Sequence, residues 1–164
     1  WGYYAVRRGS VSRTAMHAAT AIMEQSGVLA IFPEGGSWAS VLRPARPGTA
    51  YLAVHTGALL LPIGLDGLVD LFPRLRQGKR GRVTVRIGQP FGPFPGAARG
   101  RAGREALDDL GHTMMEQIAG LLPAERRGVY SDDPALVEAA QEAAVYPYHD
   151  LDALPRTKAE DEHV

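Results

Sequence analysis

A single carboxylate followed by two glycines is the feature of this sequence best suited to chemistry. The apolar run Val28–Phe32 predicts a short buried strand, and Pro33, which has no N–H for a strand ladder, predicts its end. Glu34 then precedes Gly35 and Gly36, where the backbone can turn sharply and a ligand can approach closely. Since ligands of open α/β sheets gather outside the carboxyl ends of strands, Glu34 is a candidate site residue. The alternative is an ordinary strand-to-loop turn with a solvated carboxylate.

Three arginines in nearby loops could bind an anion together with this turn. Arg8 follows an apolar and aromatic segment, and Arg43 and Arg46 lie in the loop after Glu34. A guanidinium can donate two hydrogen bonds to phosphate, each worth about 1.5–3 kcal/mol. Two or three converging arginines would therefore hold a phosphomonoester, whereas each arginine taken singly could be a solvated surface charge.

The elements that would position these residues alternate between strands and helices. The sequence predicts strands over residues 3–6, 28–32, 59–65 and 82–88, and helices over 13–25, 48–56 and 104–122. Residues 68–81 are expected to form a loop or short helix. This alternation predicts an α/β fold with a mixed, largely parallel sheet flanked by helices.

The net charge of zero hides a polarised chain. Residues 1–104 contain 14 Lys and Arg but 4 Asp and Glu, whereas residues 105–164 contain 4 and 14. The basic part favours an anionic partner, unless the acidic part folds over it and neutralises it. Residues 1–125 are expected to form the main domain, and residues 126–164 an acidic tail that is partly helical, over 135–144, or disordered.

Composition excludes several classes of protein. The chain has no cysteine, so disulfides and thiolate metal sites are ruled out. We expect no metal site. No run approaches the roughly 18 apolar residues of a membrane span. The arginines are not interleaved with aromatic residues on one strand face, which argues against a nucleic-acid-binding module.

Four ordered blocks of residues 1–90 resemble the glycerolipid acyltransferases, and in particular the 1-acylglycerol-3-phosphate acyltransferases. The blocks are Val6–Gly9, Gly27–Gly35, Arg46–Ala53 and Thr56–Ile63. The resemblance implies a glycerol-3-phosphate acyltransferase-like fold. It also implies that Arg8 and the Glu34-Gly35 turn bind the glycerol phosphate of the acyl acceptor, while the Pro62-Ile63 strand supports the site.

Two departures from that family bear on the function. The family usually continues Thr-Arg-Ser after Glu-Gly, whereas this chain has Gly36-Ser37-Trp38. Either Arg43 or Arg46 replaces the missing arginine, or the acceptor head group is not the usual one. The catalytic His-x-x-x-x-Asp block is also absent, because none of the five histidines is followed by Asp at the fifth position. Since the chain begins at Trp1 within an apolar and aromatic run, we expect the His and Asp to lie upstream of it.

The resemblance implies transfer of a fatty acyl group from acyl-CoA or acyl-carrier protein to the free hydroxyl of a lysophospholipid. The acceptor would be 1-acylglycerol-3-phosphate and the product phosphatidic acid, with the acyl thioester as co-substrate and no cofactor. The missing His would act as general base and the missing Asp would orient it. A non-catalytic phospholipid-binding or membrane-binding protein of the same fold is the alternative.

A second group of residues suits a lipid interface. Leu71 and Phe72 stand close to Arg74 and Arg76, and Trp38 lies on the loop after Glu34. Apolar and basic side chains together favour an anionic membrane surface. We therefore expect a protein on the cytoplasmic face of a membrane, either peripheral or anchored through the N-terminal part. The alternative is that the apolar residues cap the core while the arginines are solvated.

Overall fold

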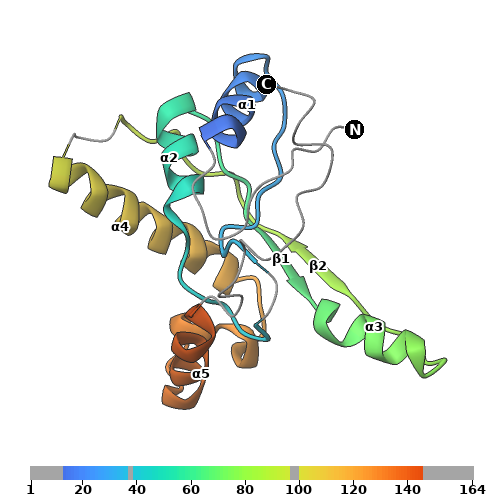
Figure 1. Cartoon of the computed structure of the whole chain (residues 1–164). Coiled ribbons are helices and arrows are strands. Elements are labelled where there is room, and N and C mark those ends of the chain that lie inside the picture. Colours follow the sequence, from blue (N-terminus) through green and yellow to red (C-terminus); the bar gives the residue numbers. More distant parts are fainter. Residues whose placement is uncertain (1–12, 37–38, 97–99, 146–164) are drawn as a thin grey trace, which may run out of the picture.

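The computed structural model describes residues 13–36, 39–96 and 100–145. The described residues form mainly helices, together with one small sheet (Figure 1). In chain order the elements are α1 (Arg13–Glu24), α2 (Pro47–Thr56), β1 (Ile63–Asp66), α3 (Leu68–Arg76), β2 (Thr84–Ile87), α4 (Gly100–Ala119), the short 3-10 helices η1 (Ala124–Arg126) and η2 (Gly128–Tyr130), and α5 (Pro134–Ala144).

Helix α4 is the central packing element. Its buried side chains contribute to two apolar clusters, because Met114 and Met115 are adjacent and point to different sides. Met114 packs with Ala50 of α2, and Met115 packs with Leu42 of the preceding loop. Helix α2 itself begins with Pro47 at its first turn and ends at Gly57, whose φ of 64° is the left-handed conformation typical of a helix end.

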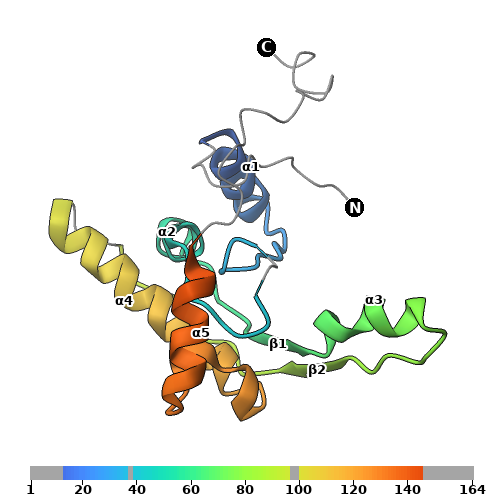
Figure 2. The same ribbon diagram turned by 60° about the horizontal axis from the view of Figure 1, so that its bottom comes forward.

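The two strands form an arm that projects from the helical body (Figures 1 and 2). They pair antiparallel, with Ile63 opposite Ile87 and Leu65 opposite Val85, and α3 lies in the connection between them. One face of the pair approaches the chain after α4 so closely that a Cβ atom on Gly64 would lie 2.8 Å from the Cβ of Leu121. Any larger residue at position 64 would push the arm away from the body.

The segment Val28–Phe32 is not a strand, so that prediction was wrong. Val28 is 96% exposed and Phe32 is 71% exposed. The strand predicted over residues 3–6 lies outside the described residues, and among the described residues no strand lies beside this segment. An apolar run becomes a buried strand only where a neighbouring backbone offers partners, and the pattern alone does not reveal them.

The other elements agree better with their sequence patterns. Helices α1, α2, α4 and α5 and strand β2 lie at or near their predicted positions, and α3 is the short helix expected within residues 68–81. The strand predicted over 59–65 is shorter and displaced, since β1 begins only after Pro62. The described residues contain one antiparallel strand pair, so the largely parallel sheet stays a prediction.

The fold continues past the expected domain boundary at residue 125. Arg126 lies in η1, and its backbone oxygen accepts a hydrogen bond of 2.9 Å from the Leu42 N–H. Helix α5 packs against η2, which in turn contacts α4. The Asp133 side chain accepts a hydrogen bond of 2.9 Å from the Ala135 N–H, which caps the N-terminus of α5.

Candidate functional site

The Glu34 turn and the loop that carries Arg43 and Arg46 are held together by their backbones. The Gly35 N–H donates to the Phe32 carbonyl at 3.1 Å and closes the turn. The Arg46 N–H donates to the Pro33 carbonyl at 2.8 Å and fastens the second loop to it. Two features that are separate in the sequence thus form one structural unit.

A buried ion pair lies inside this unit. The Arg43 side chain is 2% exposed, and its Nε lies 3.6 Å from Oε2 of Glu34, which is 23% exposed. The same carboxylate oxygen accepts a hydrogen bond of 3.0 Å from the Arg43 backbone N–H. Nη2 of Arg43 donates to the Gly36 carbonyl at 2.7 Å. Glu34 and Arg43 therefore fix the conformation of the turn from within.

These contacts differ from the predicted role of Arg43. The sequence suggested a guanidinium presented to a phosphate, whereas protein groups engage this one inside the fold. Arg46, by contrast, is exposed, and its side chain lies over the turn, with Cγ 3.1 Å from the position of a Cβ on Gly35. Of these two arginines, Arg46 is the one that faces solvent.

Burial sets the electrostatics of the pair. It raises the pKa of Glu34 above its ordinary value, against the hydrogen bond and the charge of Arg43, which act in the opposite direction. Burial likewise lowers the pKa of Arg43, opposed by Glu34 and reinforced by the positive charge of Arg46. Because the pKa of Glu34 is higher in the folded than in the unfolded state, its titration contributes stability that is fully present below the unfolded-state pKa. This contribution is lost as the pH rises through the folded-state pKa.

Tyr130, from the segment expected to be a tail, packs near the loop that carries Arg43. Tyr130 packs against the cluster that contains Leu42, and its hydroxyl lies 3.3 Å from Nδ1 of His112. Burial, together with the negative charges of Glu116 and Glu34, raises the pKa of Tyr130 to about 12. Nothing in the sequence identified Tyr130 as a neighbour of the turn, because it lies in the segment expected to be a tail.

A small open cavity adjoins the two loops. Its volume is about 100 Å³, and it is lined by Arg43, Pro44, Ala45, Arg46 and Ala144 at the end of α5. A space of this size holds a handful of water molecules and so has room for a small anion, but not for an acyl chain. The N-terminus of α2 follows immediately after Arg46 and adds partial positive charge.

The remaining predicted site residues are distributed as follows. Gly36 lies in the turn and accepts the Arg43 hydrogen bond, while Leu71, Phe72, Arg74 and Arg76 lie on α3. Arg8 and Trp38 lie outside the described residues. Of the three predicted anion-binding arginines, the described part of the chain brings Arg43 and Arg46 to the turn.

Comparisons with known proteins point to one family. Residues 1–66 match the model of the Acyltransferase family, and they contain the Glu34 turn, both loop arginines and α2. No curated protein and no solved structure matches the chain. The family match supports an acyltransferase.

The described residues contain no cluster of three or more His, Asp or Glu placed to hold a metal ion. None of the described helices combines the length and the apolar character needed to cross a bilayer.

We expect Glu34→Ala to destabilise the protein, because it leaves the buried Arg43 guanidinium without its counter-charge. The free energy of unfolding should fall by about 2–4 kcal/mol, measured by urea denaturation at neutral pH. Glu34→Gln should cost less, because the amide oxygen can still accept the Arg43 N–H. An unchanged denaturation midpoint for Glu34→Ala would contradict the structural role of the pair.

Gly35 and Gly48 offer a matched test of the turn. Gly35 has a φ of 71° and lies under the Arg46 side chain, so Gly35→Ala should lower the free energy of unfolding by about 1 kcal/mol. Gly48 lies in α2 with open space around its Cα, so Gly48→Ala should stabilise by up to about 1 kcal/mol. Urea denaturation of both variants should give shifts of opposite sign; shifts of the same sign would count against this description.

Proposed function

We propose that this chain supplies the acceptor-binding part of an enzyme that acylates a lysophospholipid. The acyl group comes from acyl-CoA or acyl-carrier protein, the acceptor is 1-acylglycerol-3-phosphate, and the product is phosphatidic acid. The observation that carries the proposal is the cavity beside Arg46, on a turn locked by the Glu34–Arg43 pair within the segment that matches the Acyltransferase family.

Each residue of the unit then has a distinct role. Arg46, exposed at the cavity, binds the phosphate of the acceptor together with Arg8. Arg43 and Glu34 position the turn and do not touch the ligand, which agrees with the repulsion expected between a carboxylate and a phosphate. The cavity size supports a head-group site, and the acyl chain of the acceptor lies outside it.

The reaction balances as an acyl transfer. The free hydroxyl oxygen of the acceptor attacks the thioester carbonyl, the carbon–sulfur bond breaks, and the hydroxyl proton passes through a general base to the departing thiolate. Holding the acceptor at Arg46 places its hydroxyl for this attack, so the contribution of these residues is positioning. The general base is a histidine in a His-x-x-x-x-Asp block, and no such block occurs in the 164 residues.

Replacement of Arg46 tests the head-group role. Losing one charge-assisted contact should weaken the binding of short-chain lysophosphatidate about 10- to 100-fold for Arg46→Ala, measured by isothermal titration calorimetry. Arg101→Ala removes a 92% exposed arginine on α4 and serves as the control, with unchanged affinity. Equal losses in the two variants, or equal affinity for lysophosphatidylcholine and lysophosphatidate, would overturn the assignment.

A non-catalytic lipid-binding protein is the second candidate, favoured by the absence of the His-x-x-x-x-Asp block. We expect residues 1–164 to bind lysophosphatidate without transferring an acyl group from labelled acyl-CoA. A longer chain that includes a His-x-x-x-x-Asp block should carry out the transfer if the enzyme proposal is correct. Binding without transfer by such a chain would favour the second candidate, and transfer by residues 1–164 would refute the role assigned to the histidine of that block.

A further inference from the structure

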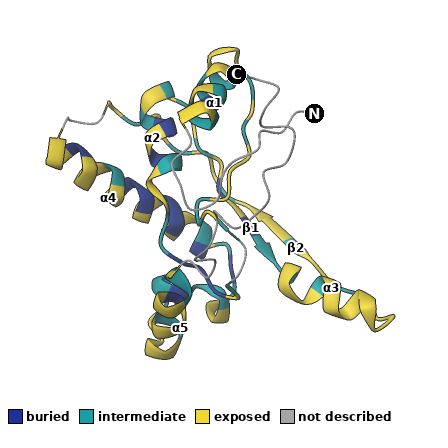
Figure 3. Ribbon diagram, in the orientation of Figure 1, coloured by how far each residue is buried: buried dark blue, intermediate teal, exposed yellow. Residues whose placement is uncertain are grey.

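Most of α3 and β2 is coloured as exposed in Figure 3, and the arm formed by β1, α3 and β2 includes exposed apolar residues. On α3, Leu68, Phe72 and Leu75 are 41%, 69% and 54% exposed. Their spacing of four and three residues places them on one stripe of the helix. Soluble proteins seldom leave such a stripe uncovered unless it takes part in an interaction.

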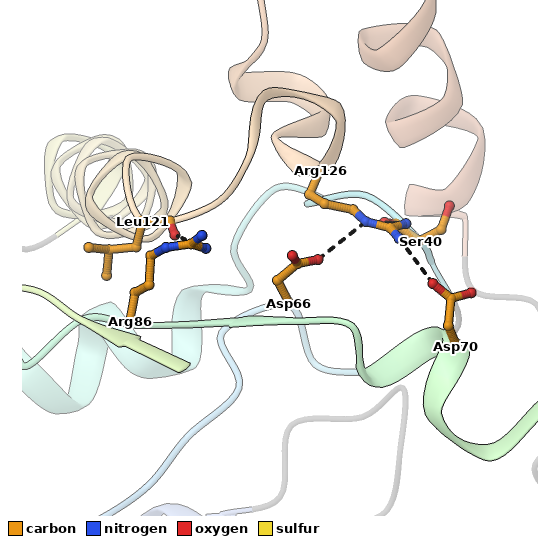
Figure 4. Close-up of polar contacts among 6 residues, drawn as sticks. All are labelled: Ser40, Asp66, Asp70, Arg86, Leu121 and Arg126. Carbon is orange, nitrogen blue, oxygen red and sulfur yellow. Dashed lines mark hydrogen bonds and ion pairs between the residues drawn. The ribbon is translucent and has the colours of Figure 1, made fainter. Parts of the chain in front are cut away.

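Two ion pairs to the body determine which way this stripe faces. The Arg126 side chain lies 3.5 Å from Oδ1 of Asp66 and 3.4 Å from Oδ2 of Asp70 (Figure 4). Its Nη1 also donates to the Ser40 carbonyl at 3.2 Å. Asp70 therefore marks the side of α3 that faces η1. At 3.6 residues per turn, the centre of the apolar stripe lies roughly 170° around the helix from Asp70, on the side away from η1.

The strand pair repeats this polarity. Asp66 and Arg86 share the face that contacts the body, where Arg86 donates to the Leu121 carbonyl at 3.2 Å. Side chains alternate along a strand, so Ile63, Val85 and Ile87 lie on the opposite face, and they are 43%, 56% and 64% exposed. The arm thus has a polar side that binds the body and an apolar side that does not.

The charge on the arm is strongly basic. Five basic residues follow within and after the helix, namely Arg74, Arg76, Lys79, Arg80 and Arg82. None of the five forms an ion pair among the described residues, and the one acidic side chain of α3, Asp70, is engaged by Arg126. An apolar stripe on an arm whose basic side chains form no ion pair with the described residues is complementary to an anionic lipid surface, where the apolar groups enter the interface and the cations meet head groups.

We propose that the arm docks on an anionic bilayer, with α3 lying in the plane of the interface. Leu68, Phe72 and Leu75 enter the boundary between head groups and acyl chains, and the basic residues bind lipid phosphates. The helix is too short to cross the bilayer, so it anchors the protein peripherally. This surface is separate from the cavity at Arg46, and the inference does not depend on acyl transfer.

Vesicle co-sedimentation tests this proposal with residues 1–164. The protein should bind vesicles made of equal parts phosphatidylcholine and phosphatidylglycerol, bind phosphatidylcholine alone much more weakly, and be released by salt. Each basic residue at an anionic surface contributes roughly a factor of five, so the double variant R74Q/R76Q should bind roughly 25-fold more weakly. The double variant F72S/L75S should lose about tenfold or more, through lost apolar insertion.

Matched variants elsewhere control for nonspecific effects. R101Q/R104Q removes the same charge from exposed positions of α4, and V145S removes an apolar side chain that is 63% exposed after α5. Both should bind the mixed vesicles as the parent does. Equal binding to both kinds of vesicle, or equal losses in α3 and control variants, would overturn the proposal and leave a protein partner as the occupant of the arm.

The docking proposal and the proposed function fail separately. R74Q/R76Q should bind short-chain lysophosphatidate as the parent does, because the head-group site does not include α3. Loss of vesicle binding with intact lysophosphatidate binding would support docking, whereas joint loss in this variant would show that the two surfaces are not independent and would contradict the proposal.

Discussion

The buried contact between Arg43 and Glu34 is the constraint on which the candidate site depends. A guanidinium inside a protein is costly unless a counter-charge and hydrogen-bond acceptors surround it. Glu34 supplies the charge and the Gly36 carbonyl supplies an acceptor, so both ends of the turn are tied to one buried side chain. Among the described residues this pair converts a glycine-rich loop, which could adopt many conformations, into a defined one.

The same pair determines the sign of the charge that is presented at the cavity. Glu34 offsets the charge of Arg43, so the cation presented to a ligand is Arg46, reinforced by the N-terminus of α2. The proposed head-group site thus presents one exposed cation, Arg46, while its negative group is kept inside the fold.

The local features of this fold could be predicted from the sequence, and the long-range ones could not. Helix α1 was predictable from its apolar spacing, and α2 from its small residues and from Gly57 at its end, because these are local signals. The run Val28–Phe32 misled, because five apolar residues indicate a strand without showing whether a partner strand exists. The burial of Arg43 had no sequence signal, since arginine is rarely buried and its partner Glu34 lies nine residues away.

The structure changes the interpretation of the uneven distribution of charge along the chain. One interpretation of the sequence was that the acidic C-terminal part folds over the basic part and neutralises it. In the described residues the contact between the two parts at the arm has the reverse sign: Arg126, from the acidic part, pairs with Asp66 and Asp70, which are two of the four acidic residues of the basic part. This pairing neutralises the carboxylates of Asp66 and Asp70, so these groups no longer offset the positive charge of the arginines on the arm. Attachment of the arm to the body and the net positive charge of the arm therefore depend on the same ion pairs.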